Sequence, residues 1–429
     1  MRLVTTATTA AVFPHSSGAR RVISVDALRG VVMFTMIFVN DLAGAPERLV
    51  PAWMRHFHGR SGMTFVDLVF PAFLFIVWMS IPFALGSRFA RGESLGKIIG
   101  HVVSRTLALL LIGIMMVNDE SPDAQAQGWS PALWATLMYL GSMLAFCEVT
   151  SGAKKSGSAE TSDAWRNVSR ALRFVGFALL AFLAFSFRGA KGQKIISLSP
   201  FFIHTEWYGI LGLIGWAYLV AATVFLCFRG HRIALLASAI LLMCLYPADQ
   251  TGAFQHFWLA RYVGIGGTLG SQAAITVAGM LLGTILVAPD TTSVAARTRF
   301  TGWFIAGFAV AALLLHGLYG IYKNSATPSW CLWSCAITAA LWLGFYHLCD
   351  VRQAGFVGRP LAAAGGNVLL AYLLSEMLPG ALELTPLDAW YGRLADTSLA
   401  GAITRSAGCA FVILFVAVRL NRLGFRLKL

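Results

Sequence analysis

Three consecutive segments decide the class of fold: SVDALRGVVMFTMIFVND (24–41), PAWMRHFHGRSG (51–62) and MTFVDLVFPAFLFIVWMSIPF (63–83). The first and third are apolar runs, and the second is a short polar loop between them. A run of about 20 apolar residues is what an α-helix needs to cross the ~30 Å hydrocarbon core of a bilayer. The pattern predicts two membrane-spanning helices joined by a loop at one membrane surface.

Polar side chains stand at unusual places in this hairpin. Asn40 and Asp41 end the first run, His56 and His58 lie in the loop, and Asp67 lies just inside the second run. Ionisable groups near lipid are costly unless they face a cavity or a partner. We therefore interpret the imidazole, carboxylate and amide groups as a candidate functional site.

The composition extends this interpretation to the whole chain. Of its 429 residues, 57% are hydrophobic and 12% are charged, whereas soluble proteins carry about 25% charged residues. The prediction is an all-α, polytopic transmembrane helix bundle of about 10–12 spans. The expected spans lie near 25–43, 64–86, 98–117, 130–149, 168–187, 206–228, 232–247, 266–288, 300–320, 328–349, 359–378 and 398–420.

The net charge of +14 reflects topology. When residues near the span ends are counted with the adjoining segments, Lys and Arg are more than twice as numerous on the N-terminal side of the membrane as in the opposite loops. By the positive-inside rule, both termini are expected in the cytoplasm and the loop at 44–63 on the outer side. The basic residues are expected to contact anionic lipid, and nucleic-acid binding is not expected.

We expect one membrane domain over 23–429, preceded by a disordered cytoplasmic arm at 1–22. A polar, small-residue segment at 151–164 predicts a flexible cytoplasmic linker. The seven cysteines lie in or at the ends of spans, and no zinc or phosphate-loop motif is present in the sequence. No metal is therefore expected.

The motifs resemble a known family. SVDALRG (24–30), IFVND (37–41) and GMTFVDLVFPAFLFIVWMSIPF (62–83) are similar to the core of the heparan-α-glucosaminide N-acetyltransferase family. GGNVLLAYLLSEM (365–377) resembles a later helix of that family more loosely. Its members are transmembrane acyltransferases, and many bacterial ones are found with amino-sugar metabolism. One departure is Trp78, where relatives usually have glycine.

The resemblance implies transfer of acetyl from cytosolic acetyl-CoA to an amino-sugar nitrogen on the periplasmic side of a bacterial inner membrane. It places the catalytic histidine at His56, with His58 as the rival. Asn40 corresponds to the family's asparagine, and Asp67 to its carboxylate at the helix start. A homodimer is also expected, because the family contains dimers.

The chemistry of these residue types fits that implication. Histidine is the usual base near neutral pH, and its second nitrogen needs an acceptor such as Asp67. Asn40 offers an amide N–H to the thioester carbonyl. Ordinary structural roles compete with these assignments. A loop histidine is commonly a solvated surface residue, Asn40 can form a turn, and Asp67 can interact with the helix dipole.

Four further residues are candidates for binding acetyl-CoA. Asp26 and Arg29 can line its entry or form an ion pair at i, i+3. Arg105 lies within a span, where it needs a partner such as Glu148 or a CoA phosphate. Asn367 follows two glycines, which allow close helix packing, and it can contact pantetheine.

The alternative function is an inner-membrane transporter of N-acetylglucosamine or a related amino sugar. Twelve spans with both termini inside is a common carrier layout. The chain shows no half-to-half repeat of the kind many carriers contain.

Overall fold

The computed structural model describes residues 22–119, 122–150, 159–189, 192–199, 201–203 and 209–429. The predicted arm at 1–22 lies outside these residues except for Val22. The predicted linker at 151–164 lies partly outside them, and the next helix already begins at Ala159.

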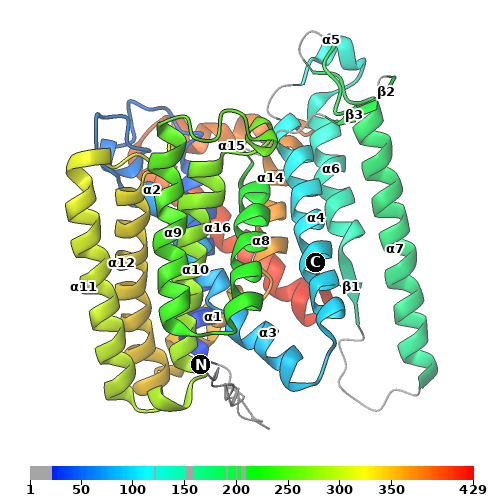
Figure 1. The fold of residues 1–429 in the computed structure, drawn as a ribbon. Helices are drawn as coiled ribbons and strands as arrows, with labels where there is room; N and C mark the ends of the chain where they lie inside the picture. The colour runs from blue at the N-terminus through cyan, green and yellow to red at the C-terminus, as the bar shows by residue number, and fades with distance from the viewer. Residues whose placement is uncertain (1–21, 120–121, 151–158, 190–191, 200, 204–208) are drawn as a thin grey trace, which may run out of the picture.

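The chain folds as a bundle of long helices that run between two ends (Figure 1). The helices are α1 (Ile23–Leu42), α2 (Phe65–Trp78), α3 (Ile81–Ala90), α4 (Leu95–Asp119), α5 (Ala124–Gln127), α6 (Pro131–Ala145), α7 (Ala159–Ser186), α8 (Ile210–Phe228), α9 (Arg232–Gln250), α10 (Ala273–Gly283), α11 (Val294–Tyr319), α12 (Pro328–Phe345), α13 (Gly355–Ala364), α14 (Val368–Glu383), α15 (Leu387–Asp396) and α16 (Leu399–Arg422). Two π-helical segments, Ile265–Gln272 and Tyr346–Val351, extend α10 and α12.

Each of the twelve predicted apolar segments coincides with a helical segment. Among the described residues, ten helices are long and apolar enough to span a membrane, and α13 with α14 forms an eleventh candidate bent by 64°. The twelfth segment is α6, an apolar helix of 15 residues that is shorter than a full span. The predicted all-α polytopic bundle is confirmed. The expected twelfth span, at α6, is too short to be counted with the candidate spans.

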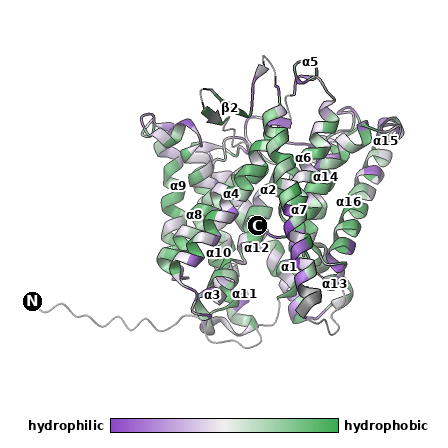
Figure 2. Cartoon of the chain, turned by 90° about the vertical axis from the view of Figure 1, so that its right-hand side faces the viewer, coloured by the Kyte–Doolittle hydropathy of each residue, from purple (hydrophilic) through white to green (hydrophobic). Residues whose placement is uncertain are grey.

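Hydrophobic residues run along the helices, and hydrophilic residues gather mainly toward the helix ends and loops (Figure 2). Among the candidate spans, the one formed by the π-helical segment and α10 is the most enclosed, because 89% of the residues in its apolar stretch are buried. In the apolar stretches of α9 and α11, only 22% of the residues are buried. The core of the bundle therefore lies around α10 and α2, and α9 and α11 form part of its periphery.

Close helix crossings depend on glycine. A Cβ on Gly30 of α1 would lie 2.1 Å from the carbonyl oxygen of Leu361, and one on Gly365 would lie 2.1 Å from the carbonyl oxygen of Asp26. The backbones of α1 and α13 therefore touch at this crossing, as the pair of glycines before Asn367 predicted.

Two small antiparallel sheets complete the fold. Strand β2 (Ile196–Leu198) pairs with β3 (Phe201–Ile203). Strand β1 (Cys147–Val149) pairs with β4 (Phe425–Leu427), in the register Cys147 to Leu427. The second pairing carries the end of the chain from α16 into the middle of the bundle, where both views place it (Figures 1 and 2).

Candidate active site

The start of α2 is built around a buried carboxylate. Thr64 caps the helix, and its hydroxyl accepts from the backbone N–H of Val66. The carboxylate of Asp67 accepts from the backbone N–H groups of Thr64 and Phe57, each at 3.0 Å. Asp67 is only 2% exposed. A carboxylate in the first turn also interacts favourably with the helix dipole, so the local sequence fixes this charge firmly.

His56 uses this fixed carboxylate as its partner. Its Nδ1 lies 2.7 Å from Oδ1 of Asp67. Because a carboxylate only accepts, this contact assigns the proton to Nδ1 and leaves the lone pair on Nε2. The His56 side chain is 45% exposed, so Nε2 can be reached from outside the bundle.

His58, two residues further on, is exposed, and it forms no hydrogen bond with any residue that the structure describes. The geometry thus connects Asp67 to His56 and leaves the rival histidine in a surface position.

A lysine that sequence reasoning missed also contacts His56. Nζ of Lys323, in the loop between α11 and α12, lies 3.1 Å from Nδ1 and 3.2 Å from Nε2 of the imidazole. Burial lowers the pKa of Lys323, and the charge of Asp67 partly opposes this shift. The sequence held no motif for this residue, since it stands 267 positions after His56.

Ser61 holds the two loops together. Its Oγ accepts from the backbone N–H of Ile321 at 2.9 Å, and the N–H of Gly62 donates to the carbonyl oxygen of Ile321 at 3.1 Å. Oγ of Ser61 also lies 3.3 Å from Nε2 of His316. The loop between α1 and α2 that carries His56 (43–64, the histidine loop) and the loop between α11 and α12 that carries Lys323 (320–327, the lysine loop) are therefore joined. They form one unit at the upper end of the bundle in Figure 1.

Asn40 has a different partner from the one its expected role suggests. Its amide donates to Oε1 of Glu376 at 3.1 Å. No hydrogen bond joins Asn40 to His56 within the part of the chain that the structure describes. Its neighbour Asp41 is held by Arg405 and Ser406 of α16 and by Tyr391 of α15. Asp41 therefore anchors the end of α1.

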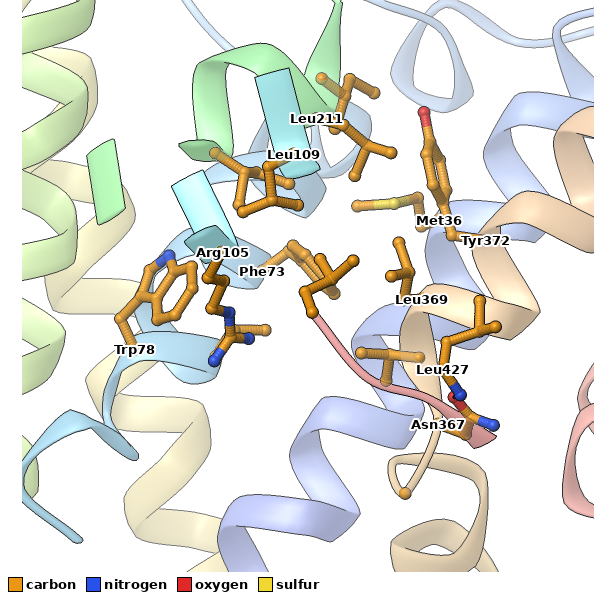
Figure 3. A pocket seen from close by; sticks show the side chains of 16 residues that line it. Met36, Phe73, Trp78, Arg105, Leu109, Leu211, Asn367, Leu369, Tyr372 and Leu427 are labelled. Carbon is orange, nitrogen blue, oxygen red and sulfur yellow. The ribbon is translucent and has the colours of Figure 1, made fainter. Parts of the chain in front are cut away.

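A cavity of about 200 Å³ lies among α1, α2, α4, α8 and α14. Its walls are mostly apolar, with Met36 and Phe73 among them, and Arg105 and Asn367 supply polar groups (Figure 3). The cavity comes close to His56 along α2. Phe73, which lines the cavity, follows Asp67 by six residues, which is roughly 9 Å along a helix.

The cavity also approaches the pair formed by Asn40 and Glu376. Met36 and Tyr372 both line it. Each stands one helical turn before a member of that pair, which corresponds to about 5.4 Å along the axis. Asn40, Glu376 and Asp67 therefore each lie on a helix that lines the cavity, four to six residues from a lining residue.

Arg105 lies at the wall of this cavity against two aromatic rings. Its guanidinium carbon is 4.8 Å from the centroid of Trp78 and 5.1 Å from that of Tyr218. These two rings stack on each other at 4.4 Å. Trp78 thus contributes to a cation–π site together with Tyr218.

Two other residues expected to bind acetyl-CoA, Asp26 and Arg29, do not line the cavity, and Glu148 does not pair with Arg105. Glu148, one of the partners considered for Arg105, pairs with Lys428 at 3.2 Å. Asp26 and Arg29 form an ion pair at 2.8 Å, and the cavity lining does not include them. This leaves Arg105 and Asn367 as the cofactor candidates that line the cavity.

Asn367 connects the cavity to the last strand. Its Nδ2 donates to the carbonyl oxygen of Phe425 at 3.4 Å, and the N–H of Leu427 lies 3.5 Å from its Oδ1. Both contacts are long for hydrogen bonds. Leu427 and Leu429 also line the cavity, so β4 forms part of its wall.

Comparisons with known proteins match the region that carries most of these residues. Residues 21–198 match the family described as Domain of unknown function (DUF5009). The chain is 37% identical over 104 residues to heparan-alpha-glucosaminide N-acetyltransferase of Mus musculus, and 37% identical over 100 residues to the protein of that name from Homo sapiens. The aligned parts cover 24% and 23% of this chain, but only 15% and 14% of those relatives. The resemblance seen in the motifs is supported by these matches over the N-terminal part of the chain.

Proposed function

We propose that the protein is a transmembrane acetyltransferase that moves acetyl from acetyl-CoA to the amino group of a glucosamine-type sugar. The observation that carries this proposal is the buried Asp67 carboxylate, which binds Nδ1 of the half-exposed His56 and so leaves the lone pair of the imidazole on Nε2. The cavity that approaches the same end of α2 supports it, and so does the likeness to relatives named for this activity.

In this reaction, the C–S bond of the thioester breaks and an amide C–N bond forms. Nε2 of His56 takes the proton that the attacking amine loses and returns it to the thiolate of CoA. Asp67 stabilises the imidazolium that forms in between. In a second route, Nε2 first attacks the thioester and expels CoA as the thiolate. The sugar amine then takes the acetyl group from the histidine, and the proton that the amine loses passes to the thiolate.

The residues of the cavity suit the donor. Its volume of about 200 Å³ is smaller than the roughly 300–1,000 Å³ of most ligand sites. It would therefore take the narrow pantetheine arm, while the nucleotide stays outside. Arg105 would supply positive charge for a phosphate, and the amide of Asn367 would hydrogen-bond to the arm.

Topology gives the proposed reaction a direction. With the N-terminus in the cytoplasm, acetyl-CoA enters from the cytoplasm and the sugar meets His56 on the periplasmic face of a bacterial inner membrane. Donor and acceptor then approach from opposite ends of the bundle. A homodimer is part of the same proposal and rests on the family resemblance alone.

The test uses purified protein in detergent with labelled acetyl-CoA and glucosamine. The wild type should form N-acetylated sugar, and His56→Ala should lose about 10²–10⁴-fold in rate, as expected for removal of a general base. His58→Ala is the matched control, and its rate should stay within about twofold, since surface changes away from a site have small effects.

Other outcomes would contradict parts of the proposal. If the wild type neither binds acetyl-CoA nor acetylates any amino sugar, the enzyme assignment fails, and uptake of N-acetylglucosamine by proteoliposomes without CoA would favour a transporter. Loss of transfer in His58→Ala alone would move the reaction to that residue. Labelled acetyl retained on the protein without acceptor, and absent in His56→Ala, would select the covalent route.

A further inference from the structure

We propose that Lys323 is a positioning residue for His56: with Asp67 it fixes the imidazole, and its ammonium group places positive charge beside Nε2, where the reacting groups meet the histidine. This inference rests on the proposed function and goes beyond it. It assigns a role to a loop that lies outside the region matched by the family model.

The contact between the two side chains is unusual in its symmetry. Nζ of Lys323 is almost equally far from both ring nitrogens, at 3.1 and 3.2 Å. Nδ1 donates its proton to Asp67, so the in-plane lone pair of the ring is on Nε2, and an Nζ equally far from both nitrogens is not aligned with that lone pair. The ammonium group therefore lies beside the ring, and the lone-pair direction of Nε2 remains open for the acceptor.

The loop that carries Lys323 is firmly built. The hydroxyl of Thr327 donates to the carbonyl oxygen of Gly320 and accepts from the N–H of Tyr322, both at 3.1 Å. The N–H of Ala326 donates to the carbonyl oxygen of Lys323 at 2.9 Å. A charge held by such a frame needs little reorganisation during the reaction, which is the condition for electrostatic stabilisation of an oxyanion.

The frame also ties Lys323 to the histidine loop. The contacts of Ser61 with Ile321 fix the separation between the two loops. Among the described residues, the charged side chains that contact His56 are Asp67 from α2 and Lys323, and Ser61 connects His316 of α11 to the same unit. The histidine loop itself also carries Arg55, His58 and Arg60. Lys323 is thus the cation that directly contacts His56 among the described residues.

The role requires Lys323 to be charged, which predicts a signature in the pH profile. Because burial lowers the pKa of Lys323, the charge is present at low pH and is lost as pH rises through a value below that of an ordinary lysine. The transfer rate should therefore fall on the basic side. An arginine keeps its charge over this range, so Lys323→Arg should move that fall to higher pH.

The experiment compares Lys323→Met and Lys323→Arg with Lys97→Met, a lysine in the first turn of α4. Lys323→Met should reduce kcat roughly 100-fold, as removal of an oxyanion-stabilising group does, with little change in the KM for acetyl-CoA. Lys323→Arg should recover part of this rate, and Lys97→Met should match the wild type. If Lys323→Met leaves unchanged both kcat and the fall of the transfer rate at basic pH, the proposal is wrong.

A second measurement does not depend on catalysis. The thermal unfolding midpoint in detergent would be measured for Lys323→Met in the wild-type and in the Asp67→Asn backgrounds. The attraction between the two charges predicts a smaller loss of midpoint in the Asp67→Asn background, whereas Lys97→Met should have the same effect in both. Equal losses for Lys323→Met would overturn the coupling.

The two measurements separate failure of this inference from failure of the proposed function. If the wild type acetylates glucosamine but Lys323→Met behaves like the wild type, the role of Lys323 fails and the acetyltransferase assignment stands. If the wild type transfers no acetyl group, the proposed function fails and the role of Lys323 in transfer fails with it. The unfolding midpoints then decide only whether its charge is coupled to Asp67.

Discussion

Arg405 and Asp41 form an ion pair in the interior, in which Nε of the arginine lies 3.0 Å from Oδ2 of the carboxylate and the side chains are only 6% and 13% exposed. Ser406 donates to the same oxygen at 2.6 Å, and Tyr391 donates to Oδ1. Burial and the hydrogen bond with Asp41 raise the pKa of Tyr391, which keeps its hydroxyl protonated as a donor. This network joins the end of α1 to α15 and α16.

Removing one member of this pair should be costly. Arg405→Met leaves the Asp41 carboxylate buried without its cation, and we expect the free energy of unfolding to fall by about 3–5 kcal/mol. The control is Arg55→Met, because Arg55 pairs with a glutamate that is 83% exposed and such pairs contribute only ~0–1 kcal/mol. Chemical unfolding in detergent would measure both. Equal losses for the two variants would contradict the assignment of Arg405 as an anchor.

Asp67→Asn should separate catalysis from folding. An amide can still cap the helix, but it does not hold the imidazole in the same tautomer, so we expect kcat to fall by roughly 10³–10⁴-fold. Asp123→Asn is the matched control, because Asp123 caps α5 through the N–H groups of Gln125 and Ala126. Rates of acetyl transfer and unfolding midpoints would be compared. A kcat for Asp67→Asn near that of the wild type would show that His56 does not depend on this carboxylate.

Gly365→Ala tests the crossing of α1 and α13. The added methyl group would meet the carbonyl oxygen of Asp26 at 2.1 Å, so the two backbones must separate, and overpacking of this kind costs about 1–3 kcal/mol. Gly302→Ala in α11 is the control, since a Cβ there meets nothing within 4 Å. We expect a lower unfolding midpoint for the first variant and an unchanged or higher one for the second. The reverse order would contradict the close crossing.

Arg105→Met should affect ligand binding and stability in different ways. The loss of a charge-assisted contact to a phosphate, worth about 1.5–3 kcal/mol, predicts at least tenfold weaker binding of acetyl-CoA. The free energy of unfolding should change little, because removal of a buried cation also removes its desolvation cost. Calorimetric titration and an unfolding curve would measure the two effects. Unchanged affinity would exclude Arg105 from the donor site.

The fold could be predicted from the sequence because membrane spans are coded locally, by runs of apolar residues. The prediction was least accurate where the chain is not a simple span. Between α13 and α14, Gly365 permits the close packing of α1, and Asn367 takes φ −143° and ψ 57°, so one expected helix is broken into two. Segment 130–149 contains only the short α6, because the chain turns into β1 at Cys147.

The site was predictable only in its local part. His56 and Asp67 are separated by 11 positions in one hairpin, so their contact follows from the loop and the helix start. Lys323 and Glu376 come from segments 267 and 336 positions away from their partners, and neither carries a local pattern that marks it. Pairings of this kind depend on how the helices pack, which a single sequence does not show.

The contact of Ser61 with Ile321 has a consequence for the synthesis of the protein. The two residues are 260 positions apart, so at about 5–20 residues per second the partner of Ser61 leaves the ribosome roughly 13–52 s later. During this interval the histidine loop has been translated, but the lysine loop that fixes it has not. Assembly of the site is thus one of the later events of biogenesis, and it waits for the hairpin of α11 and α12 to enter the bilayer.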